Sequence, residues 1–232
     1  MRAFSDLLET VTPAAATTAA RSLTTTASVK TALKITSTDA TRDALIDALI
    51  PRVTQDIVDW CRLARDGAGT APTFGSETLR ATFRTTSGYR GAELFLPWRL
   101  PVSSITSVVE DGVTLSAGTD YVLKGAMAGR IERLSDSAAI EWSTAKIVVV
   151  FVAGYSVSTS LATNIDPAIE AAAIEQVKGQ LFGADRDPTI RSENVPDVAA
   201  ISYSVPGGDV MGAEVLLPAV RSRLARFRNT TP

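Results

Sequence analysis

The sequence predicts an α+β protein, a small α-helical bundle with an inserted antiparallel β-rich module. Residues 96–155 alternate or run continuously in β-branched residues between turn dipeptides, whereas the flanking segments carry apolar residues at helical spacing. At 232 residues and 45% hydrophobic content, the chain can bury a sizeable core. We divide it into an Ala/Thr-rich arm (1–28), a first helical part (29–66), the inserted β module (67–160) and a second helical part (161–232).

The first helical part is expected to hold two helices, and residues 29–35 indicate the shorter one. The longer one follows N-cap candidates at 37–39. Its apolar residues recur at helical spacing: Leu45, Ile46, Leu49, Ile50, Val53, Ile57 and Cys61. Pro51 should kink or split this helix, because proline has no N–H to donate. The arm before it has little to bury, so we expect it to be mobile or ordered by a partner, with a short helix over 1–9 as the alternative.

The β module is defined by alternation, turn residues and one long β-branched run. Strands are expected at 79–84, 93–96, 103–110, 113–115, 121–123, 130–134 and 146–152. The last of these is nearly continuous in β-branched residues and is predicted to be central in its sheet. Asp111-Gly112 indicates a type I′ hairpin turn. The loop from Gly125 to Gly129 lacks the Lys-Ser/Thr of a phosphate loop, so we interpret it as a hairpin loop.

Helical character returns at Asp166-Pro167, which offers an N-cap followed by proline at the first helical position. One face of this helix carries Ile169, Ala172, Ala173, Val177 and Leu181, and Gly183 is expected to end it. Residues 186–208 show little periodicity and are predicted to form an extended loop. A last, Arg-rich helix covers 218–228, with an apolar stripe of Val220, Leu224 and Phe227.

Composition argues against most catalytic classes. The chain has no histidine, which excludes Ser-His and Cys-His nucleophile systems and the usual zinc sites. Its one cysteine, Cys61, excludes an intrachain disulfide and is expected to lie in the core. Asp185 and Asp187 could approach a divalent cation, although a solvated turn is the preferred interpretation. We therefore expect no enzyme, no cofactor and no metal.

Charge and hydropathy argue against binding to nucleic acid or to a membrane. With 23 basic and 25 acidic residues the net charge is −2, so no overall field attracts nucleic acid or an anionic membrane. No apolar run approaches the roughly 20 residues that span a bilayer. The first nine residues lack the features of a secretory signal, and we expect the protein to be made in a cytoplasm.

The arginines of the last helix have three possible roles. Arg221, Arg223, Arg226 and Arg228 could form a solvated face near the helix C-terminus, dock another protein, or contact DNA phosphates. Trp98 and Trp142 are interpreted as core anchors or subunit contacts in preference to base-stacking platforms. Two functions of other classes stay open: a carbohydrate- or surface-binding β module that uses these tryptophans, and an enzyme that uses carboxylates alone.

Several short motifs follow one another over residues 23–228. They are Leu23-Thr24-Thr25, Asp43-x-Leu45-Ile46, Trp60-Cys61, Leu96-Pro97, Pro101-Val102, Asp111-Gly112, Asp120-Tyr121, Gly129-Arg130-Ile131, Trp142, Ala153-Gly154-Tyr155, Pro167, Arg186-Asp187-Pro188, Ser192-Glu193 and Leu217-Pro218. In this order they resemble the head–tail adaptor (connector, or head-completion) proteins of long-tailed phages and of the related gene transfer agents.

The resemblance implies a non-catalytic ring, usually of twelve subunits, in the neck of a virion. The ring would lie below the portal protein, extend the DNA channel without binding DNA specifically, and dock a stopper or another tail protein. No membrane would be involved, and the subunits would be made in a host bacterial cytoplasm. On this basis we assign portal docking to Arg221, Arg223, Arg226, Phe227 and Arg228. Inter-subunit or tail-facing contacts are assigned to Trp98, Arg99, Asp111, Trp142, Arg186, Asp187, Ser192 and Glu193.

Overall fold

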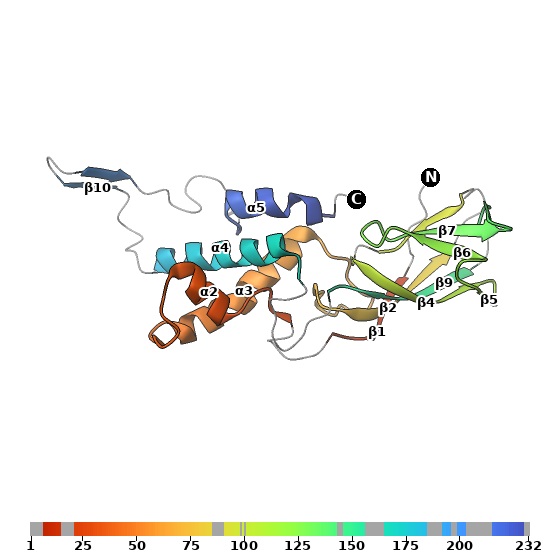
Figure 1. Cartoon of the computed structure of the whole chain (residues 1–232), viewed down its shortest axis with the longest axis horizontal. Helices are drawn as coiled ribbons and strands as arrows, with labels where there is room; N and C mark the ends of the chain where they lie inside the picture. Colours follow the sequence, from red (N-terminus) through yellow and green to blue (C-terminus); the bar gives the residue numbers. More distant parts are fainter. Residues whose placement is uncertain are drawn as a thin grey trace. The chain divides into compact units, whose positions relative to one another are not determined.

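The computed structural model describes residues 7–14, 21–84, 91–97, 99, 101–142, 146–155, 165–184, 192–195, 199–202 and 215–229. The chain forms two compact units, and the predicted α+β class is confirmed (Figure 1). The first, here the β unit, comprises Met1–Arg21, Arg62–Ser160 and Asn229–Pro232. The second, here the helical unit, comprises Ser22–Cys61 and Leu161–Arg228.

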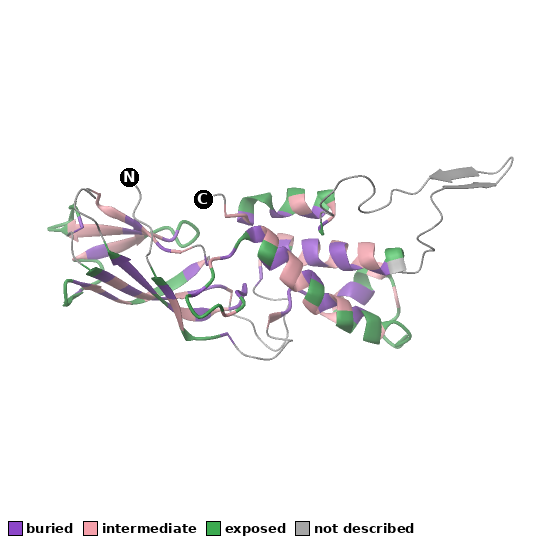
Figure 2. Cartoon of the chain, turned by 180° about the vertical axis from the view of Figure 1, so that it is seen from behind, coloured by how far each residue is buried: buried purple, intermediate pink, exposed green. Residues whose placement is uncertain are grey.

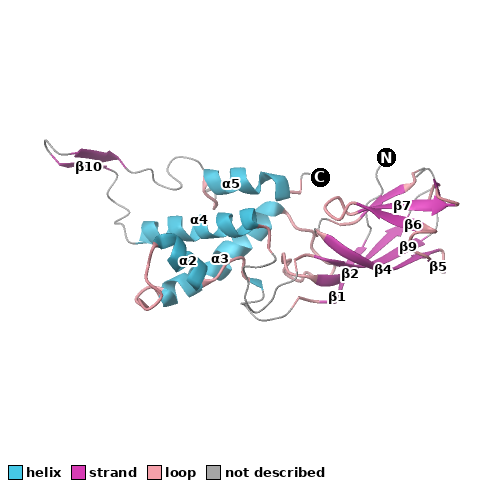
Figure 3. Ribbon diagram, viewed as in Figure 1, coloured by secondary structure: helices cyan, strands magenta, loops and turns pink. Residues whose placement is uncertain are grey.

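The β unit contains two antiparallel sheets (Figure 3). The larger sheet has the order β1-β2-β9-β4-β5, from β1 (Leu7–Thr12), β2 (Glu77–Arg84), β9 (Lys146–Ala153), β4 (Val102–Glu110) and β5 (Val113–Leu115). The smaller sheet has the order β3-β7-β6, from β3 (Glu93–Phe95), β7 (Arg130–Ser135) and β6 (Tyr121–Lys124), and β8 (Ala138–Ala139) pairs with β7. All of the predicted strands are present, and β9 is central as predicted.

The core of the β unit follows from strand alternation. Leu79 and Phe83 of β2 and Val149 and Phe151 of β9 are fully buried, while their immediate neighbours along each strand are more exposed. Figure 2 shows buried and more exposed stretches along the strands of this unit. Ile131 of β7 belongs to the same buried cluster, so both sheets contribute to one core. Burial of this many large apolar side chains supplies the main driving force for folding of the unit.

Turn chemistry agrees with the hairpins that the sequence predicts. Asp111 and Gly112 have φ values of 49° and 80°, as a type I′ turn between β4 and β5 requires. The loop between β6 and β7 is closed by hydrogen bonds from the Ala128 and Gly129 N–H groups to the Gly125 carbonyl. The interpretation of this glycine-containing segment as a hairpin loop is therefore confirmed.

The N-terminal segment differs from the expectation. Residues 7–12 form an edge strand that pairs with β2, where we expected an arm or a short helix. Leu8 is buried opposite Ala81, and its carbonyl accepts a hydrogen bond from the Gly67 N–H. The pairing partner lies about seventy residues along the chain, so local composition contains no sign of it.

The helical unit consists of α2 (Thr26–Leu33), α3 (Asp43–Cys61), α4 (Pro167–Ala184), α5 (Pro218–Leu224) and the 3₁₀ turn η2 (Ala225–Phe227). The Thr25 hydroxyl caps α2 by accepting from the Ser28 N–H at 3.1 Å. Helix α3 continues through Pro51, so of the two expected effects of the proline, a kink or a split, the split is wrong. The buried face of the helix includes Ile50 and Val53 on either side of the proline. Packing of this face compensates for the hydrogen bond that proline cannot donate.

Two further predictions concern this unit. Cys61 is fully buried, and burial raises the pKa of its thiol to about 12, which confirms a core cysteine. The segment predicted as an extended loop contains a hairpin, β10 (Ser192–Val195) with β11 (Ala199–Ser202). Neither Ser-Glu-Asn-Val nor Ala-Ala-Ile-Ser alternates apolar with polar residues, so the sequence pattern does not indicate these strands.

Candidate docking surfaces

A buried glutamine holds the chain segment that leads into the C-terminal helix. Gln176 lies on α4, and its Nε2 donates to the Val215 carbonyl at 2.9 Å. Its Oε1 accepts from the Leu217 N–H, also at 2.9 Å. The side-chain amide of Gln176 therefore hydrogen-bonds to the 215–217 backbone as a neighbouring strand would. Its donor and its acceptor both have a partner.

Side chains complete the attachment of α5 to the helical unit. Val220, Leu224 and Phe227 are buried, which confirms the predicted apolar stripe. Gly179 of α4 leaves room for Leu217, since a Cβ at this glycine would lie 2.7 Å from the Leu217 Cδ1. Because the ring of Phe227 belongs to this internal contact, its proposed part in portal docking requires correction: little of it is accessible.

We predict that Gln176→Ala lowers the free energy of unfolding of the helical unit by about 1–3 kcal/mol, because a carbonyl and an N–H lose their partner. Urea denaturation followed by circular dichroism would measure the change. The control is Lys178→Ala on the same helix, which is half-buried and should change stability by less than about 0.5 kcal/mol. Equal losses from both substitutions would show that the glutamine does not hold the segment.

The predicted arginine cluster lies on α5 and just after it, and several of its members already have partners. Arg223 lies 3.4 Å from the Glu175 carboxylate, and Arg226 lies 2.8 Å from that of Asp166. The Arg228 guanidinium lies over the ring of Trp60, 5.0 Å from its centroid. Arg223 and Arg226 remain about half exposed or more, so a partner could still reach them.

The structure separates the residues that we assigned to inter-subunit or tail-facing contacts. Asp111 is exposed at its hairpin turn. Ser192 and Glu193 lie in β10. Trp98, Arg186 and Asp187 lie outside the described residues, as does Asp185. Arg99 and Trp142 are buried in the β unit, which corrects their assignment to an accessible surface.

Arg99 and Trp142 have internal roles that explain their burial. Arg99 pairs with Glu77 at 2.6 Å and donates to the carbonyls of Ala64 and Thr73. Trp142 packs in the core, with the Arg133 guanidinium 6.0 Å from its ring centroid. A buried indole cannot stack on a sugar or a base, so Trp142 does not support the carbohydrate-binding or base-stacking alternatives.

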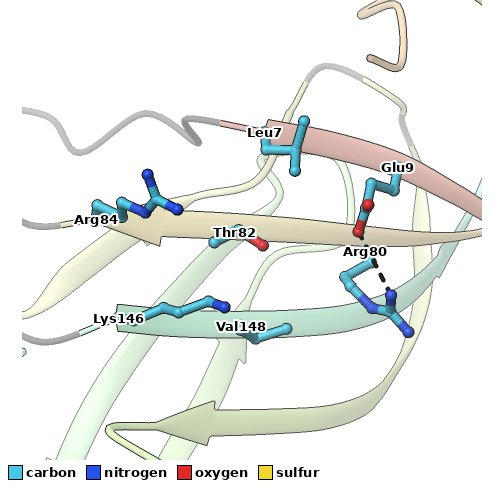
Figure 4. A pocket seen from close by; sticks show the side chains of 7 residues that line it. All are labelled: Leu7, Glu9, Arg80, Thr82, Arg84, Lys146 and Val148. Atoms are coloured by element: carbon cyan, nitrogen blue, oxygen red, sulfur yellow. Dashed lines mark hydrogen bonds and ion pairs between the residues drawn. The ribbon is translucent and has the colours of Figure 1, made fainter. Parts of the chain in front are cut away.

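A pocket of about 580 Å³ lies on the larger sheet, over β1, β2 and β9 (Figure 4). Arg84 and Lys146 lie at one end of it, and Arg80 and Glu9 form an ion pair at the other, with 3.4 Å between Nη1 and Oε2. This site has no local signature in the sequence. Alternation of arginines with apolar residues along β2 was visible, but the neighbours across the sheet depend on strand register.

Arg84 and Lys146 are direct cross-strand partners in the β2–β9 pair. Among the described residues neither makes an ion pair, and like charges directly opposite each other destabilise a sheet. We predict that Lys146→Glu raises the free energy of unfolding by about 0.2–1 kcal/mol, because it creates an opposite-charge pair. Thermal unfolding would measure the gain, with the exposed Arg52→Glu on α3 as a control without this neighbour. An equal shift from both substitutions would contradict the proposed repulsion.

Within the described parts of the chain, His, Cys, Asp and Glu side chains form no group of three that could hold a metal ion. Across the same residues, none of the helices combines the length and the hydropathy needed to span a membrane.

Comparison with known proteins gives matches at the level of structure. No family model matches the sequence, and no curated protein matches it. A chain from the neck of a native gene transfer agent particle, solved with C12 symmetry, aligns over 97% of both chains with a TM-score of 0.50 and 17% identity. Chains from the neck of an empty particle (C6 symmetry) and from a native particle virion align with TM-scores of 0.49 and 0.48, each at 18% identity. The first comparison shows a shared fold along nearly the whole chain.

Proposed function

We propose that this protein is a structural adaptor in the neck of a tailed phage or phage-like particle. It would form a ring of twelve subunits below the portal, extend the DNA channel and dock a stopper or tail protein. It would act without catalysis, and DNA would pass through the lumen without specific binding. The protein would be synthesised in the host cytoplasm and would then be incorporated into the virion.

One observation carries this proposal: the fold matches a chain of a gene transfer agent neck over 97% of both lengths. A match of this coverage includes the helical unit, the β unit and the connections between their segments. The order of motifs in the sequence points independently to the same class of protein. One fold can serve several functions, so the assembly role is tested directly on particles and on binding to the portal.

Deletion of the gene from the producing genome tests the function as a whole. Particles without this protein should accumulate as DNA-filled or leaking heads that have no tails, and electron microscopy would show them. Supplying the wild-type gene in trans should restore tailed particles. Normal tailed particles in the deletion strain would refute the adaptor function.

The portal contact that we assign to the arginines requires substitutions that respect their internal partners. Reversing the charge of Arg223 and Arg226 would place acids against Glu175 and Asp166, so loss of binding could result from a displaced α5. Arg223→Gln with Arg226→Gln removes both charges without that repulsion. We expect it to weaken binding to purified portal at least tenfold, which titration calorimetry would measure.

The matched control keeps both arginines and replaces their acidic partners. Glu175→Gln with Asp166→Asn eliminates both internal ion pairs, and asparagine can still cap α4 as Asp166 does. Portal binding should be retained or improved in this variant. Equal weakening by both double variants would favour the interpretation of these arginines as an internal, solvated face.

A further inference from the structure

We propose that the pocket over β1, β2 and β9 binds an extended acidic segment of a partner protein. In this proposal a carboxylate of the segment pairs with Arg84 and Lys146, and an apolar side chain two residues away packs on Leu7 and Val148. This surface differs from the C-terminal arginines, so the proposal goes beyond the adaptor function and does not depend on it.

Two positive charges lie next to each other at one end of the pocket. Arg84 of β2 and Lys146 of β9 are direct partners on neighbouring strands, and both side chains are exposed. Neither has an ion-pair partner among the described residues, so their mutual repulsion is a cost that nothing described in the chain offsets. A bound carboxylate would relieve this repulsion and could accept hydrogen bonds from both groups.

Beside the two cations, the pocket is lined by apolar and polar side chains. Leu7 is 43% exposed although it lies on a strand, and Val148 is half-buried. Thr82 lies between them in the register, since it pairs with Leu7 on one side and with Val148 on the other (Figure 4). Burial of a Val- or Leu-sized side chain against these residues would add a favourable hydrophobic contribution.

The side chains of β2 that line the pocket have the spacing of an extended peptide. Arg80, Thr82 and Arg84 occur at every second position of β2 and lie on one face, so they repeat at roughly 6.6 Å. An extended peptide presents alternate side chains at the same interval. The site therefore suits an acidic residue, an apolar residue two positions on, and a polar residue two positions further that meets the Arg80–Glu9 pair.

The same lining disfavours nucleic acid. Binding to a duplex relies on many phosphate contacts from a broad basic surface. Here two cations that form no ion pair with any described residue lie beside apolar side chains and the Glu9 carboxylate, which would repel a phosphate backbone. The pocket thus matches one carboxylate and its neighbours better than a row of phosphates.

Titration of the full-length protein with a synthetic peptide tests the proposal. The probe is the pentapeptide Glu-Ser-Leu-Ser-Asn, acetylated at its N-terminus and amidated at its C-terminus. The control peptide, Lys-Ser-Leu-Ser-Asn, replaces the acidic residue with a basic one. Backbone amide NMR shifts at millimolar peptide should change at Leu7, Thr82 and Val148 with the acidic probe. The lysine peptide should bind at least fivefold more weakly. No shifts at these residues, or equal affinity for both peptides, would overturn the proposal.

Variants then test the two cations. Arg84→Gln with Lys146→Gln should weaken the acidic peptide at least fivefold without lowering the thermal midpoint, since the substitutions remove a repulsion. The control, Arg52→Gln with Lys178→Gln, removes two charges from helices outside the pocket and should leave affinity unchanged. Unchanged affinity in the pocket variant would overturn the proposal even if the adaptor function is correct.

Two other occupants are outcomes of the same experiment. In one outcome, a 20-base-pair DNA duplex shifts the amide signals of Leu7, Thr82 and Val148, whereas neither peptide does. The site would then bind nucleic acid, and the proposal would be wrong. The chain itself has an exposed Asp-x-Val motif at Asp111 and Val113. Self-association that Arg84→Gln with Lys146→Gln abolishes, in the absence of peptide binding, would identify a second copy as the occupant and overturn the partner-protein assignment.

Discussion

Replacing Arg99 with methionine is expected to lower the free energy of unfolding of the β unit by about 3–5 kcal/mol, because it leaves Glu77 as an uncompensated buried charge. Both side chains are about 97% buried, and the two groups are 2.6 Å apart. Arg99 also donates to the Ala64 carbonyl at 2.5 Å, and Glu77 accepts from the Ala14 N–H at 3.4 Å. The pair thus connects the start of β2 with three other segments of the same unit.

The loss of stability in Arg99→Met arises from the desolvation of the Glu77 carboxylate. In the native protein, the ion pair with Arg99 offsets this desolvation. Burial lowers the pKa of Arg99, while the neighbouring carboxylates of Glu77 and Asp66 raise it. When one partner is removed, the favourable interaction is lost and the penalty of the remaining charge is kept. Hydrogen exchange of the β9 amides, which belong to the central strand, would report the stability of this unit.

Two controls distinguish the buried pair from a general effect of charge. Lys124→Met removes one partner of an ion pair with Glu132 in the same unit, but Lys124 is 44% exposed, so the loss should be below about 1 kcal/mol. Arg99→Met with Glu77→Leu removes both buried charges and should recover part of the loss. Similar losses from Arg99→Met and Lys124→Met would contradict a stabilising role for the buried pair.

The arginine also illustrates what the sequence could and could not predict. Strands, the Asp111-Gly112 turn and the stripe of Val220, Leu224 and Phe227 were predictable, because alternation, turn residues and helical spacing are local signals. Arg99 was assigned to an inter-subunit or tail-facing contact on the basis of the family resemblance, whereas charged side chains are buried only where they are paired. Its burial depends on Glu77, a partner 22 residues away, and no local pattern reveals that pairing.

The candidate sites divide in the same way. The arginines at the C-terminal end were identified from their local density. Their pairing with Glu175 of α4 and with Asp166, which immediately precedes α4, depends on how the helices pack. The pocket on the larger sheet was missed, because it combines residues from β1, β2 and β9. Only the register that places Leu7, Thr82 and Val148 side by side creates it.

One glycine in a motif that carries the family resemblance, Gly154, has a structural reason to be glycine. Its φ is 102°, a region that other residues rarely adopt. A Cβ at this position would lie 2.9 Å from the Phe74 carbonyl oxygen, 2.7 Å from the Gly75 carbonyl carbon and closer still to its oxygen. The backbone approaches because the Tyr155 N–H donates to the Phe74 carbonyl and the Gly154 N–H donates to that of Pro101.

Gly154→Ala is therefore expected to destabilise the β unit by more than about 4 kcal/mol, since strain in φ and a clash with backbone atoms act together. Unlike a side chain, the 74–75 backbone cannot rotate away without losing its hydrogen bonds. Gly118→Ala is the matched control: its φ is 80°, but no atom lies within 4 Å of the added Cβ. That substitution should cost about 1–2 kcal/mol from φ alone. Chemical denaturation of both variants measures the difference, and similar losses would show that the close backbone approach contributes nothing.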